Sequence, residues 1–338
     1  MLFFEYYKMK NILFYFETKS TNPYYNLAFE EYVLTHRTQG DYLMLWQNDN
    51  TIVVGQNQNT LAEIDDHFVH DHKINVVRRS TGGGAVYHDL GNLNYSFITD
   101  VGDAERLTMD RFTAPIVSAL NGLGVHAEAA GRNDILVEGR KVSGTAQRLV
   151  GDRILHHGTL LFASNLEVLS GALRADPTKF SSKATKSVRS RVGNIRALLP
   201  RDMEMAEFWD YLKNTLTAEG LEICTLSEEE LTAVEKLKRE KYDAWEWNYG
   251  RSPQYDQTAK RRWDGGTLEI GLKVKKGLIE EIRFYGDFLS IDSLDAIQNA
   301  LRGIPHQRQA FDAVLRRYSM SRYFGTITRE EVLETLFA

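Results

Sequence analysis

The stretch Val76–Ile98, VVRRSTGGGAVYHDLGNLNYSFI, constrains the fold more than any other part of the chain. A buried strand ends at its start, two arginines follow, and three consecutive glycines, Gly82–Gly84, precede a second, alternating strand over Asn92–Ile98. Glycine has no Cβ, so the N–H groups of this loop can approach an anion closely, and Arg79 adds a rigid fork of donors for a phosphate or a carboxylate. The pattern predicts an anion-binding loop held against a sheet. A plain tight turn in a β-rich domain is the alternative.

Two common nucleotide-binding motifs are excluded for this loop. It lacks the Gly-Lys-Ser/Thr ending of a P-loop. It is also not the G-x-G-x-x-G turn that opens a helix, because a strand follows the glycines.

Composition limits the class of protein. The 338 residues are 43% hydrophobic and 26% charged, which is typical of a globular chain with length for two domains. A net charge of −5 gives no basic field for nucleic acid, so no nucleic-acid partner is expected. No apolar run reaches the roughly 18 residues that indicate a membrane helix, so no membrane association is expected. Cys224 is the only cysteine, so no disulfide forms within the chain and a cytoplasmic location is expected. Met9 is a second candidate start, and the aromatic segment before it lacks a signal-peptide pattern.

Periodicity and turn signals predict alternating strands and helices. A strand over 11–16 precedes a helix that begins at Asn22-Pro23 and ends near Gly40, and strands over 42–46 and 51–55 form a hairpin. Further helices are predicted over 61–72, 107–123, 166–173, 203–216 and 228–241, and further strands over 125–129, 153–155 and 158–162. After a junction at 241–255 we expect two strands around 275–277 and helices near 294–301, 307–318 and 330–337. The expected architecture is α+β, with a large domain over residues 1–248 and a small accessory domain over 249–338.

A second informative stretch, GRNDILVEGRKVSGTAQR, runs from Gly131 to Arg148. It predicts two short strands, 134–137 and 140–142, joined by a turn at Glu138-Gly139. Lys141 lies in the second strand, just before the hydroxyl of Ser143. An isolated lysine is usually a surface residue, but a position beside glycines and hydroxyls makes Lys141 a candidate functional residue.

Arg79, Lys141 and the loop glycines suit the joining of a carboxylate to the α-phosphate of a nucleotide. Both reacting groups are anions. Bringing them together therefore needs fixed positive charge, which Arg79 and Lys141 would supply. Backbone donors from Gly83 and Gly84 would add to it.

Five further residues keep two interpretations each. Asn133 and Asp134 either cap a turn or bind a hydroxyl, an amine or Mg²⁺ near phosphates. His157 is either a hydrogen-bond donor in a pocket or a structural histidine. Trp46 and Tyr87 belong either to the core or to a pocket wall.

Several ordered motifs together resemble the lipoate–protein ligase A family: RRSTGGGAVYHDLGNLNYSF, GRNDILVEGRKVSGTAQR, HHGTLLF, NLAFEE at Asn26–Glu31 and KSVRSRVGNIR at Lys186–Arg196. The resemblance covers the catalytic domain nearly end to end and continues through WNYGRSP into the small C-terminal domain of the family's long form. It implies a fold shared with biotin ligases, in which a mixed β-sheet flanked by helices is followed by an accessory domain.

The resemblance also implies a reaction in two halves. Lipoate and MgATP give lipoyl-AMP and pyrophosphate. The lipoyl group then passes to the ε-amine of a lysine on an acceptor domain, such as an E2 subunit of a 2-oxoacid dehydrogenase or the H protein of glycine cleavage, and AMP is released. ATP and Mg²⁺ are thus the implied cofactors, without a tightly bound prosthetic group.

The resemblance and the residue patterns described above together give the candidate site residues. Lys141 contacts both ATP and the lipoyl carboxyl group, so Lys141 and Arg79 are the catalytic candidates. The segment 179–196 resembles the family's adenylate-binding loop. Candidate ATP or adenylate contacts are Arg79, Gly83, Gly84, Ala85, Val86, Tyr87, Asn133, Asp134, Lys141, Ser143, Lys186 and Arg189. Candidate lipoate contacts are Lys141, Trp46, Val77 and His157, and Asp134 is the candidate Mg²⁺ ligand.

Two alternatives remain at this stage. An octanoyl or lipoyl transferase on the same fold needs a catalytic cysteine, and Cys224 lies far along the chain from the glycine loop and from the histidine strand. A non-catalytic protein that binds lipoate or a nucleotide would retain lipoyl-AMP and label no acceptor.

Overall fold

The chain divides into two compact units, each assembled from separate stretches of sequence. The computed structural model describes residues 13–101, 109–173, 192–217, 221–250, 255 and 257–337. The first unit contains the described residues of Met1–Thr51, His88–Leu166 and Lys186–Tyr242, and the second those of Ile52–Tyr87, Glu167–Thr185 and Asp243–Ala338. The glycine-loop region and the C-terminal part therefore belong to one compact unit. The predicted domain boundary at residues 248 and 249 stays a prediction.

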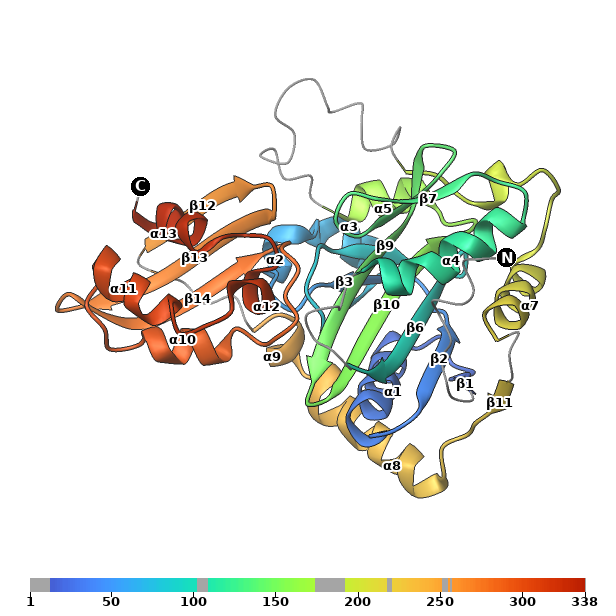
Figure 1. Cartoon of the computed structure of the whole chain (residues 1–338), viewed down its shortest axis with the longest axis horizontal. Coiled ribbons are helices and arrows are strands. Elements are labelled where there is room, and N and C mark those ends of the chain that lie inside the picture. The colour runs from blue at the N-terminus through green and yellow to red at the C-terminus, as the bar shows by residue number, and fades with distance from the viewer. Residues whose placement is uncertain are drawn as a thin grey trace. The chain divides into compact units, whose positions relative to one another are not determined.

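A mixed eight-stranded sheet is the frame of the first unit (Figure 1). The strands are β1 (Leu13–Phe16), β2 (Asp41–Trp46), β6 (Asn92–Asp100), β7 (Ala127–Ala130), β8 (Asp134–Val137), β9 (Arg140–Val150), β10 (Arg153–Leu161) and β11 (Leu221–Ile223). Their order is β11-β1-β2-β6-β10-β9-β8-β7. β1 is parallel to β11 and to β2, whereas every pair from β2 to β7 is antiparallel.

Helices cover both faces of this sheet. They are α1 (Pro23–His36), α4 (Asp110–Gly122), α7 (Met205–Leu216), α8 (Glu228–Leu237), the 3-10 helix η4 (Arg196–Leu198) and the π-helix η5 (Lys238–Tyr242). Leu93, Tyr95 and Phe97 of β6 share one hydrophobic core with α4 and α7. The intervening Ser96 points to the opposite face and contacts α1, which packs beside α8. None of the described helices is both long and apolar enough to cross a lipid bilayer.

The start of α1 shows how the local sequence sets an element boundary. The side-chain oxygen of Asn22 accepts hydrogen bonds from the N–H groups of Tyr24 and Tyr25, at 3.0 and 3.1 Å. Pro23 occupies the first helical position, where no N–H is needed. The predicted start is confirmed, and the helix ends at His36, a little before the predicted end.

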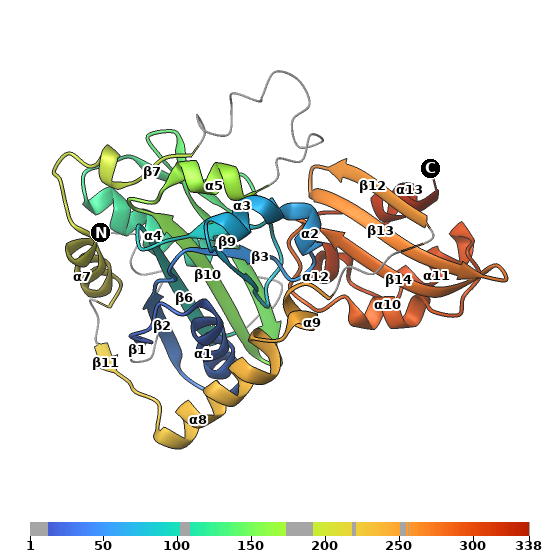
Figure 2. The same ribbon diagram turned by 180° about the vertical axis from the view of Figure 1, so that it is seen from behind.

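The second unit contains two three-stranded sheets, each with its own hydrophobic core. The sheet of the C-terminal part is labelled in Figure 2. The first has the order β4-β3-β5 and consists of β3 (Thr51–Val54), β4 (Asn75–Arg78) and β5 (Val86–His88), with helices α2 (Thr60–Glu63), α3 (Asp66–Asp71) and α5 (Leu166–Ala172). The second has the order β12-β13-β14 and consists of β12 (Gln257–Trp263), β13 (Gly266–Lys275) and β14 (Leu278–Gly286). The other described helices of this unit are α9 (Trp245–Asn248), α10 (Asp295–Leu301), α11 (Arg308–Leu315), α12 (Met320–Phe324) and α13 (Arg329–Phe337).

The predicted hairpin over residues 42–55 is wrong. Both strands exist, but β2 pairs with β1 and β6, whereas β3 pairs with β4 and β5 in the other sheet. Every residue of β2 and of β3 is buried, so neither strand shows an alternation that would identify its partner.

Four other predictions needed smaller corrections. The helix predicted over 61–72 is two short helices, α2 and α3, and the strands predicted at 153–155 and 158–162 are one strand, β10. β9 continues to Val150 instead of ending at Val142, because its pairing with β10 extends the ladder. The C-terminal sheet has a third strand, β12, at its edge, which the sequence pattern missed because its residues are mostly exposed.

Candidate active site

The glycine loop begins where β4 ends, and Arg79 holds its shape. The Arg79 guanidinium donates from Nη2 to the carbonyl oxygens of Gly82 and Gly84, at 2.6 and 2.8 Å. It also donates from Nε to Thr81 Oγ1 at 3.0 Å and from Nη1 to the carbonyl of Val53 at 3.1 Å. The side chain is buried. Arg79 therefore supplies a fixed positive charge whose donors are engaged with neutral oxygens of the loop and of β3.

Two glycines make the tight path of this loop possible. Gly83 has a φ of +90°, in the region that favours glycine. A Cβ on Gly55 would lie 2.0 Å from the carbonyl oxygen of Gly83, so the loop passes directly over Gly55. The N–H of Gly83 donates to the carbonyl of Phe288 at 3.2 Å. One of the backbone donors predicted to face an anion is thus engaged by the C-terminal part of the same unit.

Arg78, beside Arg79, is fully buried and surrounded by neutral oxygen acceptors. Its guanidinium donates to the carbonyls of Gly55, Gln56, Gln58, Trp247 and Asn248 and to Thr60 Oγ1, at 2.7–3.2 Å. The backbone of Arg78 also binds α9, which contains Trp247 and Asn248. The Arg78 N–H donates to Asn248 Oδ1, and Trp247 Nε1 donates to the Arg78 carbonyl, both at 2.8 Å. Arg78 therefore joins the base of the glycine loop to α9.

Lys141 lies at the start of β9 in the first unit. Its Nζ is 2.6 Å from Asp134 Oδ1 on β8. The side chains are 39% and 28% exposed, respectively, so this pair faces solvent while remaining in contact. The structure thus brings together two residues that the sequence predicted for ATP binding.

Asn133 and Ser143 differ from that pair in orientation and partners. The carbonyl of Asn133 accepts from the Thr145 N–H at 2.8 Å, and its Nδ2 donates back to the Thr145 carbonyl at 2.7 Å. Ser143 lies opposite the buried Ile135, on the face of the sheet that looks into the core. The Ser143 side chain is therefore on the face opposite that of Lys141, and Asn133 extends the β8–β9 ladder. Their predicted ATP contacts stay predictions.

Trp46 and His157 meet through two residues that sequence reasoning missed. Trp46 Nε1 donates to Ser96 Oγ at 2.9 Å, Ser96 Oγ donates to Glu30 Oε1 at 2.6 Å, and His157 Nδ1 lies 2.9 Å from the same Glu30 oxygen. All four side chains are buried. Glu30 lies in NLAFEE among apolar helix residues, and an acid in such a position needs buried partners, which is the signal that would have found it.

His156 has a different environment from its neighbour His157. It is fully buried, stacks on Phe112 with ring centroids 4.8 Å apart, and places Nδ1 3.1 Å from Gln147 Nε2. Burial lowers the pKa of His156 to about 3, and the charge of His157 contributes to the same shift. His156 is therefore a neutral residue of the core.

The other predicted site residues belong to the second unit or lie outside the described residues. Val77 is fully buried in β4, and Tyr87 is buried in a hydrophobic core with residues of β3 and β4, against which Ala85 packs. Val86 begins β5. Lys186, Arg189 and most of the segment 179–196 lie outside the described residues.

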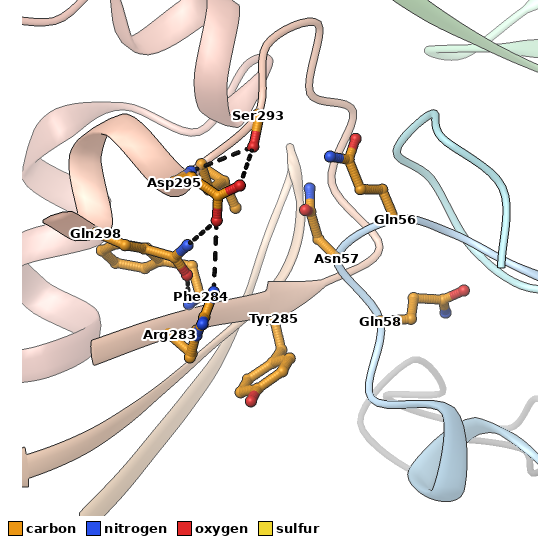
Figure 3. Close-up of a pocket in the computed structure, with 10 residues that line it drawn as sticks. Gln56, Asn57, Gln58, Arg283, Phe284, Tyr285, Ser293, Asp295 and Gln298 are labelled. Carbon is orange, nitrogen blue, oxygen red and sulfur yellow. Dashed lines mark hydrogen bonds and ion pairs between the residues drawn. The ribbon is translucent and has the colours of Figure 1, made fainter. Parts of the chain in front are cut away.

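A small polar pocket in the second unit holds none of the predicted site residues (Figure 3). It is lined by Gln56, Asn57, Gln58, Arg283, Phe284, Tyr285, Ser293, Leu294, Asp295 and Gln298. Asp295 accepts a hydrogen bond from Ser293 Oγ at 2.8 Å and lies 3.4 Å from Arg283 Nη1. Gln298 accepts from the Phe284 N–H at 3.1 Å. The side chains of Arg283, Ser293, Asp295 and Gln298 thus bind one another or the backbone of β14, and the pocket is not proposed as an active site.

The described residues contain no group of three or more His, Cys, Asp or Glu side chains suited to a metal ion. Asp134, the predicted Mg²⁺ ligand, is a single carboxylate beside Lys141. This donor set fits a cation that is held mainly by the phosphates of a nucleotide, as Mg²⁺ commonly is.

Family models define the class of protein. A model described as the lipoyl protein ligase A/B catalytic domain matches residues 22–217, and one described as the bacterial lipoate protein ligase C-terminus matches residues 252–336. The first match alone covers more than half of the chain. The fold is thus that of a lipoyl-ligase catalytic domain accompanied by a bacterial accessory domain, as the resemblance implied.

Curated relatives extend over nearly the whole chain. Lipoate-protein ligase LplJ of Bacillus subtilis is 41% identical over 332 residues, which cover 96% of this chain and 100% of that protein. Lipoate–protein ligase 1 of Staphylococcus aureus is 42% identical over 318 residues, which cover 94% and 97%. The chain belongs to the lipoate–protein ligase family, and the predictions of an enzyme and of this family are confirmed.

Solved structures agree with this fold. A Plasmodium falciparum protein crystallised with lipoate has a TM-score of 0.78 at 23% identity and covers 96% of this chain and 97% of its own. Lipoate-protein ligase A bound with ATP has a TM-score of 0.60 at 27% identity and covers 71% and 98%. The predicted α+β architecture, with a mixed sheet flanked by helices and a small accessory part, is confirmed.

Proposed function

We propose that this chain activates lipoate with ATP to give lipoyl-AMP and then transfers the lipoyl group to a lysine of an acceptor domain. The names of the relatives support lipoate as the substrate, and the ATP-bound ligase structure supports ATP. The observation in this chain that best supports the proposal is the partly exposed Lys141 ammonium. Its contact with Asp134 fixes its position on the surface of the β8–β9 hairpin.

In the first half-reaction, a carboxylate oxygen of lipoate attacks the α-phosphorus of ATP while the bond to pyrophosphate breaks. Both reactants are anions, and the Lys141 ammonium stabilises the negative charge where they meet. Arg79, Gly83 and Gly84 are proposed to contact the nucleotide. Because Arg79 donates to loop carbonyls and Gly83 to Phe288, phosphate oxygens must replace some of these acceptors or add to them.

In the second half-reaction, the ε-amine of an acceptor lysine attacks the acyl carbon of lipoyl-AMP and the bond to AMP breaks. The nucleophile comes from the acceptor, so the enzyme supplies positioning and electrostatic stabilisation instead of a nucleophile of its own.

The position of Cys224 argues against a transferase that works through a cysteine thioester. Cys224 follows β11 at one edge of the eight-stranded sheet, and Lys141 lies on β9, five strand positions away in the order. At about 4.8 Å between neighbouring strands, this separation is roughly 24 Å. Burial also raises the pKa of the Cys224 thiol, with the carboxylate of Glu222 adding to the shift, so the reactive thiolate is disfavoured.

The remaining participants are proposals of the same kind. Trp46, Val77 and His157 are proposed to contact the lipoyl group, and Mg²⁺ to arrive with ATP beside Asp134. E2 lipoyl domains and the glycine cleavage H protein are the proposed acceptors, in the cytoplasm.

Pyrophosphate release and acceptor labelling test this function together. With ATP and lipoate the purified chain should release pyrophosphate, and an apo E2 lipoyl domain should gain the mass of one lipoyl group. Lys141→Ala should reduce pyrophosphate release by about 10²–10³-fold, which is typical for the loss of one electrostatic contact to a transition state. Labelling from an octanoyl or lipoyl thioester without ATP would instead indicate a transferase, and lipoyl-AMP binding without labelling would indicate a non-catalytic protein.

A further inference from the structure

The pairing of β8 with β9 contains an irregularity beside Lys141. The pairing advances by one residue on β8, from Ile135 to Leu136, but by two on β9, from Ser143 to Lys141. Val142 is therefore one extra residue on β9, which is the definition of a β-bulge.

This bulge decides which face of the sheet Lys141 occupies. In a regular ladder Lys141 would lie opposite Val137, whose side chain is buried in the core. With the bulge, Val142 enters the core instead and is fully buried, while Lys141 lies opposite Leu136 on the outer face. Asp134, two residues from Leu136 on the same strand, points to that same face.

Gly144 leaves the space that the lysine side chain crosses. It lies directly opposite Asp134 in the ladder, and so on the same outer face as that carboxylate and Lys141. A Cβ built on Gly144 would lie 3.6 Å from both Cε and Nζ of Lys141. A single methyl group would therefore touch the end of the lysine, and a branched side chain would occupy its path.

The backbone of Lys141 is fixed from its other side as well. Lys141 forms a parallel bridge with Val192, and its carbonyl accepts from the Gly193 N–H at 3.0 Å. With the backbone held between two partners, the remaining freedom of Lys141 lies in its flexible side chain, and the contact with Asp134 restricts the end of that chain.

We propose that Asp134, the bulge at Val142 and the bare backbone of Gly144 together position the Lys141 ammonium for adenylate formation. Asp134 is thus a positioning residue that acts through Lys141. This inference rests on the proposed function, and it gives Asp134 a role in the enzyme before any nucleotide is bound. An ion pair at this degree of exposure contributes little to folding, so the expected consequence of losing it is in rate and not in stability.

Two variants remove different parts of this arrangement. Asp134→Asn keeps the shape of the side chain and removes its charge, whereas Gly144→Val keeps both charged groups and fills the path of the lysine. Because a misplacement of about 1 Å at a reacting group costs up to about 10²-fold, each variant should lower kcat for pyrophosphate release by roughly ten- to a hundredfold. Asp134→Glu, which retains the carboxylate, should recover part of the rate.

Glu128→Gln is the matched control. Glu128 is an exposed carboxylate on β7 that lies opposite Leu136, on the same face as Lys141 but one strand further away. Its loss should leave kcat and KM unchanged. Melting temperatures of all variants report folding, and the Asp134 variants carry the test where Gly144→Val does not fold.

The outcomes of these assays distinguish a failure of this inference from a failure of the proposed function. Wild-type rates in Asp134→Asn and Gly144→Val, beside an inactive Lys141→Ala, would overturn the positioning role alone. Recovery of Asp134→Asn activity by raised Mg²⁺ would also overturn it, because Asp134 would then act as a metal ligand. A wild-type chain that releases no pyrophosphate from lipoate and ATP would overturn the proposed function itself.

Discussion

Arg79 and Lys141 carry the same charge, but the structure uses the two in opposite ways. The Arg79 guanidinium is buried and donates four hydrogen bonds to neutral oxygens within its own unit. The Lys141 ammonium is 39% exposed and contacts one carboxylate across a hairpin. The loop arginine is therefore a part of the scaffold that also contributes a fixed field, whereas the hairpin lysine is a charge that solvent reaches and that is proposed to contact the substrates.

We therefore expect substitutions at the buried Arg79 region to cost more folding free energy than substitutions at the exposed Lys141 pair. Removing a donor from buried acceptors leaves each acceptor unsatisfied, at a cost of about 1–3 kcal/mol. Removing one member of an exposed ion pair costs at most about 1 kcal/mol. Substitutions around the glycine loop should thus appear first as lost stability, and those on the β8–β9 hairpin as lost rate.

Arg78→Met should give the largest effect on stability. The methionine removes a donor from five carbonyls and from the Thr60 hydroxyl. The carbonyls of Gly55 and Asn248 keep second donors, from the Gln58 N–H and Thr60 Oγ1, but those of Gln56, Gln58 and Trp247 lose the Arg78 donor, so we expect a loss of about 3–5 kcal/mol. Urea denaturation measures this loss as a lower midpoint. Arg302→Met, at an exposed position of the same unit, is the control and should leave the midpoint within about 0.5 kcal/mol of the wild type. An equally stable Arg78→Met would remove the argument that buried donors hold this region together.

Reciprocal exchanges of arginine and lysine sharpen the comparison. Lysine at position 79 lacks the planar fork that reaches Gly82, Gly84 and Val53 at once, so Arg79→Lys should lose about 1–3 kcal/mol of stability. Lys141→Arg should keep its stability, but a guanidinium is bulkier than an ammonium and Gly144 leaves little extra room, so adenylation should fall by roughly 10²-fold. Denaturation midpoints and pyrophosphate release, measured on both variants, report the two effects. The opposite pattern, with a stable Arg79→Lys and an unstable Lys141→Arg, would contradict the assignment of scaffold and substrate-facing charge.

The sequence identified the two stretches that matter, but it left their partners open. The glycine triplet and the setting of Lys141 are local patterns, and the structure places both as predicted, at the end of β4 and in a strand. The partners of Arg78 are not local, because its contact with Asn248 joins residues 170 positions apart. The bulge at Val142 adds one residue to a strand, and a pattern of period two does not show which residue is the extra one.

Buried polar residues were the hardest to predict for a related reason. Glu30 and Ser96 were missed because each looks ordinary in its own element, and their role appears only when α1 is packed on β6. The adjacent histidines were predicted between two strands, whereas the structure places both inside β10 with opposite orientations. Alternation along a strand therefore explains why His157 contacts Glu30 while His156 enters the core.

The buried His156 should make the stability of the chain depend on pH, whereas an accessible histidine should not. Its pKa is about 3 in the folded chain, against about 6.5 for an ordinary histidine, so below pH 6.5 the unfolded chain binds a proton that the folded chain does not. The free energy of unfolding should therefore fall as the pH falls from about 6.5 towards 3, by roughly 1.4 kcal/mol per pH unit from this residue. At pH 5 the expected loss is about 2 kcal/mol relative to neutral pH.

His156→Gln should flatten this slope, although it also lowers the stability at neutral pH because the stacking on Phe112 is lost. Urea denaturation of both chains between pH 7.5 and about 5 tests the prediction, in a range where most carboxylates stay ionised. His126→Gln removes an exposed histidine from the same unit and should leave the wild-type slope unchanged. Parallel slopes for the wild type and His156→Gln would mean that His156 takes up a proton in the folded chain, and its assignment to the core as a neutral residue would then be wrong.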